Sequence, residues 1–169
     1  MGEASFRSVK IGNQVWMASD LKVNDGGEGI DKLAGYTFYT WDAAKRVADT
    51  IPGWRLPTKQ EFEELIKYCE SQGLEASSAL RSVSTWQPQV GEDDKPGTNA
   101  VGFGARRGGS LGTTYHGGAA RYNYKTYYWT STADSSGKAH YVMSISPDDV
   151  DVDKAERDHT SIPVRLIKE

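Results

Sequence analysis

The stretch that decides the fold of this chain is residues 51–58, which read IPGWRLPT. A residue that precedes proline is pushed out of the α region, so a helix before this stretch must end ahead of its first proline. A second helix can begin at Thr58, whose hydroxyl can cap the backbone N–H of Glu61 while Glu61 reaches back to Thr58, as in a capping box. Between these points, Trp54 and Leu56 alternate with a charged residue, which predicts a short extended segment with both side chains in the core.

Helical spacing of apolar residues on both sides of this stretch predicts two amphipathic helices. The first is expected over residues 41–49 with Thr40 as its N-cap, and the second over residues 59–70. The apolar stripe of the second helix consists of Phe62, Leu65, Ile66 and Cys69. The lone cysteine is therefore interpreted as a packing residue, and it excludes an internal disulfide framework and a cysteine-rich zinc site.

The remaining segments are typical of strands and turns. A hairpin is predicted over residues 9–17 with its turn at Gly12 and Asn13. Further strands are expected at 36–39, 127–132, 140–146 and 161–167, with a short helix at 77–83. Helices in the first half and antiparallel strands in a loop-rich, glycine-containing second half indicate an α+β fold. We expect one domain over residues 8–169, preceded by a tail of residues 1–7 that is natural or a remnant of trimming.

Composition limits the classes of partner. The 169 residues carry a net charge of −3, so the chain as a whole has no basic footprint for nucleic acid. No apolar run reaches the roughly 18 residues that a membrane span needs. The first five residues lack a basic-then-apolar signal pattern, which leaves open a signal or lipid-anchor segment that has been trimmed away.

Six motifs occur in the order in which one bacterial family carries them. They are GNQVWMA at 12–18, YTWDAA at 39–44, GWRLPT at 53–58, GFGA at 102–105, YWTST at 128–132 and SIPVR at 161–165. Over about residues 8 to 168 the chain resembles the Fibrobacter succinogenes major paralogous domain, which is found in many secreted or lipid-anchored bacterial surface proteins. The resemblance implies a C-type lectin-like fold, in which two main helices flank a twisted antiparallel sheet. It implies function only loosely, because fold alone does not carry function.

Two stretches have some features of calcium sites. One resembles the calcium-dependent sugar-binding site of lectins and the other a calcium-binding loop, but each lacks ligands that such a site requires. C-type lectins that bind sugar through calcium use an acid-containing proline triplet, whereas Gln89 stands here in place of the acid, and no Trp-Asn-Asp triplet is present. Asp25 and Glu28 lie in a polar, glycine-bearing loop without the spacing of an EF-hand. We expect both stretches to be solvated loops.

An acidic run near the C-terminus leaves two interpretations open. Asp149, Asp151 and Asp153 alternate, so a strand would place all three carboxylates on one face. They could hold calcium, or they could form a solvated face that protects an edge strand from pairing with another chain. No other cofactor is expected.

The best candidate for a binding surface is the segment 113–127, which mixes tyrosine, arginine, asparagine and glycine as paratope loops do. Tyrosine rings can stack on sugars or anchor a protein partner. The alternative is that these rings pack the sheet, which we expect for Tyr128 and Trp129. The predicted ligand-binding residues are Trp86, Tyr115, His116, Arg121, Tyr122, Asn123, Tyr124 and Tyr127.

Catalysis is not expected. The three histidines are far apart in sequence without metal-ligand spacing, and formylglycine-generating enzymes, which share the related fold, need a cysteine pair that one cysteine cannot supply. We therefore expect a non-enzymatic extracellular or cell-surface recognition domain that binds carbohydrate or a surface protein. The alternatives are a structural module of a bacterial surface or adhesin assembly, and a variable receptor-binding protein of the diversity-generating-retroelement type.

Overall fold

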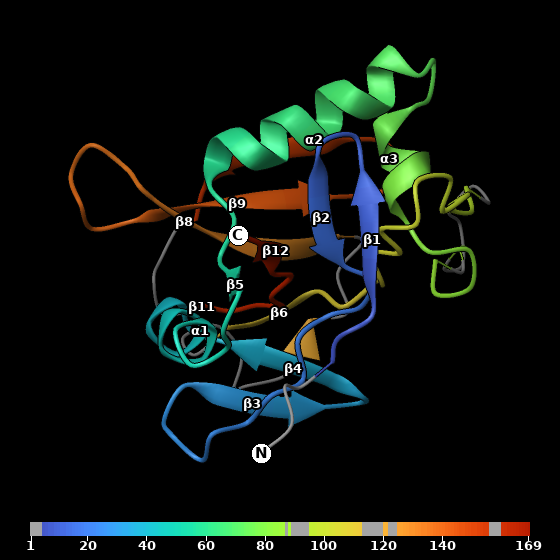
Figure 1. Ribbon diagram of the computed structural model, residues 1–169. Helices are drawn as coiled ribbons and strands as arrows, with labels where there is room; N and C mark the ends of the chain where they lie inside the picture. Colours follow the sequence, from blue (N-terminus) through green and yellow to red (C-terminus); the bar gives the residue numbers. More distant parts are fainter. Residues whose placement is uncertain (1–4, 87, 89–94, 113–119, 122–124, 156–159) are drawn as a thin grey trace.

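The structure is a computed structural model that describes residues 5–86, 88, 95–112, 120–121, 125–155 and 160–169 (Figure 1). It has an α+β architecture of helices and antiparallel sheets. The helices are α1 (Trp41–Ala48), α2 (Lys59–Ser71) and α3 (Ala76–Leu80). The strands are β1 (Ser8–Ile11), β2 (Gln14–Met17), β3 (Ile30–Leu33), β4 (Tyr36–Tyr39), β5 (Trp54–Arg55), β6 (Ser110–Gly112), β7 (Ala120–Arg121), β8 (Thr126–Ala133), β9 (His140–Ile145), β10 (Val150–Lys154), β11 (Thr160–Ser161) and β12 (Ile167–Lys168).

The two predicted helices and their caps are confirmed. The Thr40 hydroxyl accepts a hydrogen bond from the backbone N–H of Ala43 at the start of α1. At the start of α2, the Thr58 hydroxyl accepts from the N–H of Glu61 at 3.1 Å, and the Glu61 carboxylate accepts from the N–H of Thr58 at 3.2 Å. Glu61 also binds Arg55, with Nη2 2.7 Å from Oε1, so the capping box fixes the extended segment before it. Within the described residues, none of the helices is long and apolar enough to cross a membrane.

A four-stranded sheet joins the two ends of the chain. Its strand order is β1-β2-β12-β5, and β12 pairs antiparallel with both of its neighbours, so that Ile167 lies opposite Trp16 and Arg55. The hairpin of β1 and β2 turns at Gly12, which has φ +60°. A Cβ there would also lie 3.0 Å from the Tyr68 ring, so the turn is held close to α2.

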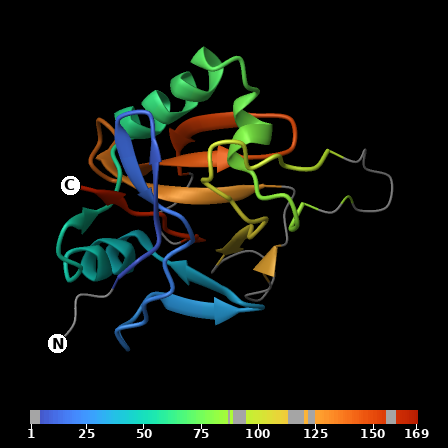
Figure 2. The same ribbon diagram turned by 45° about the vertical axis from the view of Figure 1, so that its right-hand side comes forward.

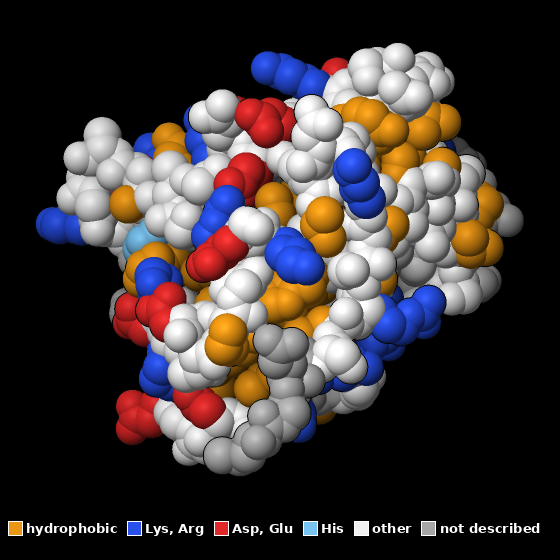
Figure 3. All heavy atoms as spheres, in the orientation of Figure 1, with side chains coloured by type: hydrophobic (Ala, Val, Ile, Leu, Met, Phe, Trp, Pro, Cys, Tyr) orange, Lys and Arg blue, Asp and Glu red, His pale blue; other side chains and the backbone are white. Residues whose placement is uncertain are grey.

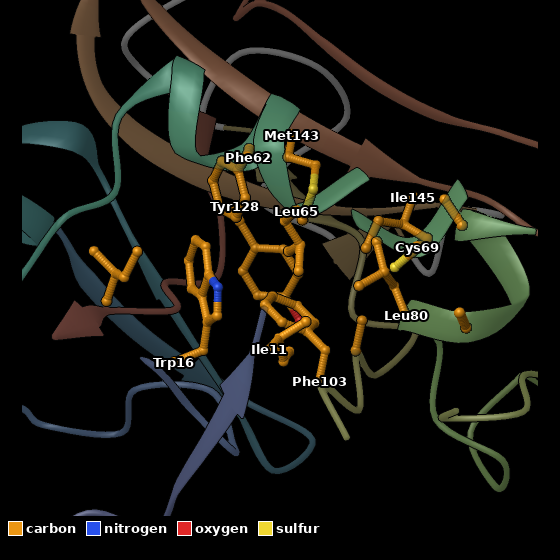
Figure 4. Packing of buried hydrophobic residues seen from close by; sticks show 14 residues of the cluster. Ile11, Trp16, Phe62, Leu65, Cys69, Leu80, Phe103, Tyr128, Met143 and Ile145 are labelled. Atoms are coloured by element: carbon orange, nitrogen blue, oxygen red, sulfur yellow. The ribbon is translucent and has the colours of Figure 1, made fainter. Parts of the chain in front are cut away.

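Helix α2 lies along the three-stranded sheet β10-β9-β8, as both ribbon views show (Figures 1 and 2). The main core fills the space between this helix, this sheet and β2. Trp16 is stacked on Phe62 with ring centroids 5.1 Å apart, and Phe103 makes edge contacts with Trp16 and Tyr128 (Figure 4). Cys69 is buried in this cluster, which confirms that it is a packing residue.

A second core cluster surrounds α1 and contains Leu56 and Trp129. Leu56 is 2% exposed, as predicted from its alternation in residues 51–58. The prediction for Trp54 was only partly right, because its side chain is half-buried and packs edge-to-face on Phe6, with ring centroids 6.3 Å apart. Trp54 lies in β5 at the edge of the four-stranded sheet, where no further strand covers it.

The prediction of one continuous strand over residues 161–167 was wrong. Only its two ends lie in strands, β11 and β12, and every residue from 161 to 167 is buried. Between the two strands, the backbone forms hydrogen bonds with other segments of the chain. Ile162 forms an isolated β-bridge with Tyr39, and the carbonyl oxygen of Val164 accepts a hydrogen bond from the N–H of Leu21. The segment runs through the middle of the molecule, with Ile162, Val164 and Leu166 in the second core cluster and Ile167 in the main one, so neither of its faces meets solvent.

The polar loop predicted after β2 holds one strand that its composition did not indicate. Ile30–Leu33 forms β3 and pairs with β4 to make a two-stranded hairpin at the end of the molecule opposite α2 (Figure 2). Earlier in the loop, Asp25 accepts hydrogen bonds from Arg46, with Nε 2.7 Å from Oδ2. This ion pair occupies the carboxylate that would have had to bind calcium.

Candidate recognition surface

The described ends of the tyrosine- and glycine-rich segment meet in a small antiparallel sheet. Its strand order is β11-β6-β7, with Gly112 opposite Thr160 and Ser110 opposite Arg121. Gly112 and Thr160 are the residues that border segments 113–119 and 156–159. The sheet thus brings two parts of the chain, far apart in sequence, to one place.

Most of the predicted ligand-binding residues lie outside the described part of the chain. These are Tyr115, His116, Tyr122, Asn123 and Tyr124. Arg121 is placed by its backbone in β7. Tyr127 is half-buried in β8, opposite Ser144, and packs against the second core cluster. Its neighbours Tyr128 and Trp129 are fully buried, as expected for rings that pack the sheet.

The ring of Trp86 is not accessible to a ligand, because only 3% of the residue is exposed. Its Nε1 donates a hydrogen bond to the carbonyl oxygen of Ala105 at 2.7 Å. The guanidinium of Arg81 lies 5.2 Å from the ring centroid. Since its polar atom and its ring are both used inside the protein, we leave Trp86 out of the recognition surface.

Of the three aspartates near the C-terminus, Asp151 and Asp153 lie in the edge strand β10 and Asp149 directly precedes it. Asp149, Asp151 and Asp153 are exposed, and each accepts a hydrogen bond from the N–H of the next residue, at 2.7 to 2.9 Å. In the parts of the chain that the structure describes, no three acidic, histidine or cysteine side chains are grouped so as to hold a metal ion. Within the described structure, strand β10 pairs with β9 on one side and has no strand on the other, as the edge-protecting interpretation requires. Calcium binding by these residues stays a prediction.

Beside the β11-β6-β7 sheet, Arg106 is stacked on a tyrosine of the β3–β4 hairpin. The Arg106 guanidinium carbon lies 4.3 Å from the centroid of the Tyr36 ring, and Nη1 lies 3.5 Å from the carbonyl oxygen of Gly35. A Cβ on Gly108 would be 3.0 Å from Cδ1 of the same ring, so the tyrosine lies directly against the backbone there. Glycine at this position lets the ring approach and gives Arg106 a fixed aromatic support.

The backbone of a second basic residue is bonded close to this contact. The N–H of Gly109, the residue after Gly108, donates a hydrogen bond to the carbonyl oxygen of Lys125 at 3.1 Å. Lys125 is exposed and Arg106 is half-buried. Neither forms an ion pair with any carboxylate among the residues that the structure describes. We call Tyr36, Arg106, Lys125 and strands β6, β7 and β11 the recognition surface.

Comparison with known families is decisive for the identity of the domain. The family described as the Fibrobacter succinogenes major domain matches residues 9–168. The chain belongs to this family. No curated protein and no solved structure gives a match.

In this Fibrobacter succinogenes major domain, charge is divided unevenly along the chain. Residues 95–133 contain five Lys and Arg and no Asp or Glu, while the rest of the chain contains 15 Lys and Arg and 23 Asp and Glu. The whole-chain charge of −3 therefore combines +5 in this window with −8 elsewhere. Arg106 and Lys125 belong to the basic window, and in Figure 3 Lys and Arg side chains gather beside the tip of the β3–β4 hairpin.

Sequence reasoning missed Tyr36 and Arg106 as parts of a surface, whereas Lys125 lies within the segment 113–127 that it proposed as a binding surface. The basic window is visible in the sequence and could have indicated Arg106 and Lys125. Tyr36 carried no such signal, because it lies 70 residues before Arg106 in a hairpin whose position only the fold decides.

Proposed function

We propose that this domain is a non-enzymatic recognition module of a secreted or surface-attached bacterial protein, with a C-type lectin-like fold. It binds carbohydrate or a protein partner through the recognition surface. The fold assignment is supported by the sheet that joins β2 to β12 near the two ends of the chain, and by helices packed beside a twisted antiparallel sheet. Family membership and the motifs of the chain agree with it.

The observation that carries the binding proposal is the Tyr36–Arg106 stack beside the described ends of the segment 113–127. Arg106 is held against an aromatic ring and has no carboxylate partner among the described residues. A guanidinium that is positioned by a ring and has no countercharge among the described residues can bind an anionic or polar group of a partner. The adjoining segment supplies tyrosine, asparagine and glycine, which are adaptable contact residues.

The proposal that no chemistry is involved is supported by the state of the one cysteine. Burial raises the pKa of the Cys69 thiol to about 11, so at neutral pH it is protonated and enclosed in the core. A thiol in that state is a poor nucleophile.

The test is a screen of the purified domain against arrays of glycans and of surface proteins. We expect a binder whose signal is lost in the double variant Tyr122→Ala/Tyr124→Ala. The matched control is Tyr141→Ala, a half-buried tyrosine of β9 next to Lys59, away from the recognition surface. Unchanged binding by the double variant would place the site elsewhere, and the absence of any binder would favour a structural module of a surface assembly.

A further inference from the structure

We propose that the aspartates of strand β10 prevent the domain from associating with itself. Their carboxylates occupy the backbone N–H donors along an open sheet edge, and so keep β10 from pairing with β10 of a second copy of this chain. This inference is independent of what the recognition surface binds.

The two edges of the sheet β10-β9-β8 differ in how they are covered. Along β8, Thr126 forms an isolated bridge with Gly109, and the N–H of Ser131 donates a hydrogen bond to the carbonyl oxygen of Pro57. Strand β10 pairs with β9 over five consecutive residues without a register shift, and no described strand lies on its other side. A regular edge strand is a template for pairing with another chain, so β10 is the edge of this sheet that needs protection.

The register of β9 and β10 decides which backbone groups face the open edge. The N–H of Ala155 donates to the carbonyl oxygen of His140, and the carbonyl oxygen of Asp149 accepts from the N–H of Ser146. Residues 149 and 155 are therefore bonded toward β9, and in an antiparallel ladder every second residue between them is bonded in the same direction. The intervening residues point the opposite way, so the outward N–H groups are those of Val150, Val152 and Lys154.

These three outward donors are the ones that the aspartates occupy. Oδ1 of each aspartate accepts from the N–H of the next residue: Asp149 from Val150 at 2.8 Å, Asp151 from Val152 at 2.9 Å, and Asp153 from Lys154 at 2.7 Å. A strand that pairs with this edge must displace these caps, and hydrogen bonds to a charged acceptor are stronger than those to a neutral carbonyl. A second copy brings the same three capped donors, so the caps act on both strands of such a pair.

Repulsion between carboxylates opposes the same pairing. In an antiparallel pair, outward-facing residues lie opposite outward-facing residues, and the residues between them lie opposite one another. When β10 pairs with its own copy, odd-numbered residues therefore lie opposite odd-numbered residues, and from 149 to 153 these are all aspartates. A register centred on Val152, for example, places Asp151 opposite Asp153 of the second copy. Like charges directly opposite each other destabilise a strand pair.

The experiment measures self-association by sedimentation velocity over a range of protein concentrations. The triple variant Asp149→Ala/Asp151→Ala/Asp153→Ala removes the charges and the caps. The triple variant Asp149→Asn/Asp151→Asn/Asp153→Asn removes the charges but keeps a side-chain oxygen that can accept from the next N–H. The control Asp42→Ala/Glu70→Ala/Glu75→Ala removes the same charge at exposed residues outside β10. Circular dichroism melts verify that each variant is folded.

A proline variant shows whether association uses this edge. The N–H of Val152 faces away from β9, so Val152→Pro leaves the hydrogen bonds between β9 and β10 in place while it removes the central outward donor. Added to the triple alanine variant, Val152→Pro should return self-association to the wild-type level. In the wild-type background it should change nothing.

We expect the triple alanine variant to self-associate at least about tenfold more tightly than the wild type, the control and the triple asparagine variant. The inference is overturned if the triple alanine variant associates no more than the wild type, or if the control associates as strongly as that variant. It is also overturned if Val152→Pro leaves the association of the alanine variant unchanged. Equal association of the asparagine and alanine variants would overturn the role of the caps, because charge alone would then close the edge.

Discussion

The guanidinium of Arg165 and the carboxylate of Asp20 form a buried ion pair across 145 residues of sequence, with Nη2 2.5 Å from Oδ1. The Tyr128 hydroxyl donates a hydrogen bond to the same carboxylate oxygen at 2.9 Å. Arg165 also donates from Nη1 to the carbonyl oxygens of Met17 and Phe103. One side chain therefore joins the first sheet, the loop before β6, and the segment that runs through the middle of the molecule.

Replacing Arg165 by methionine should reduce the free energy of unfolding by about 3–5 kcal/mol, because the substitution leaves the Asp20 carboxylate buried without its countercharge. The measurement is urea denaturation followed by tryptophan fluorescence. Lys45→Met is the control, since it removes the exposed pair with Asp49 within α1 and should cost no more than about 0.5 kcal/mol. Equal losses in the two variants would contradict a structural role for the buried pair.

Two tryptophans should differ in their contribution to stability. Trp16 is fully buried and stacked on Phe62, so Trp16→Ala should cost about 3–5 kcal/mol through the cavity that it leaves. Trp54 is half-buried at a sheet edge, and Trp54→Ala should cost roughly half as much. Chemical denaturation monitored by far-UV circular dichroism gives both values. A loss for Trp54→Ala as large as that for Trp16→Ala would show that β5 is buried more deeply than described.

The Cys69 thiol should resist modification in the folded protein. Burial raises its pKa to about 11, so at pH 8 the thiol is protonated as well as enclosed. Reaction with Ellman's reagent at pH 8 should be at least about a hundredfold slower in buffer than in 6 M guanidinium chloride. Rapid reaction in buffer would mean that α2 detaches readily from the core.

The Asp25 carboxyl should titrate well below an ordinary aspartate. Its hydrogen bonds to Arg46 lower its pKa from 3.8 to about 2. A depressed folded-state pKa stabilises the fold above the unfolded value of 3.8, and this contribution disappears as the pH falls from about 4 to about 2. Carboxyl ¹³C NMR titration gives the pKa directly, and Arg46→Gln should return it toward 3.8. A pKa that stays near 2 in that variant would assign the shift to the backbone N–H of Gly27 instead.

Gly108→Ala should disturb the Tyr36–Arg106 stack without unfolding the domain. The new Cβ would lie 3.0 Å from Cδ1 of Tyr36, so the ring must move away from the backbone. Arg106, supported by that ring, should then lose the ring-current shift of its Nε–Hε resonance in ¹⁵N NMR spectra. Tyr36→Leu sets the limit of complete loss. An unchanged resonance in Gly108→Ala would mean that Arg106 is held by contacts other than the ring.

The sequence alone determined the local elements and the family. The caps at Thr40 and Thr58, the apolar stripe of α2 and the turn at Gly12 depend on residues within about four positions of one another. Such interactions form whenever the chain is helical or turned, so their signals can be read without the fold. The ordered motifs likewise identified the family that matches residues 9–168.

Tertiary structure decided everything that depends on which surfaces meet. Alternation in residues 161–167 predicted one continuous strand, but the whole segment is buried and only its two ends lie in strands. Trp54 is half-buried and Trp86 is fully buried because different segments of the folded chain cover the two rings. The pattern of neighbouring residues does not show which segments these are. The Tyr36–Arg106 stack joins residues 70 positions apart. A contact of that kind exists only after the hairpin and the basic segment have packed, so this part of the candidate site became visible only in the folded chain.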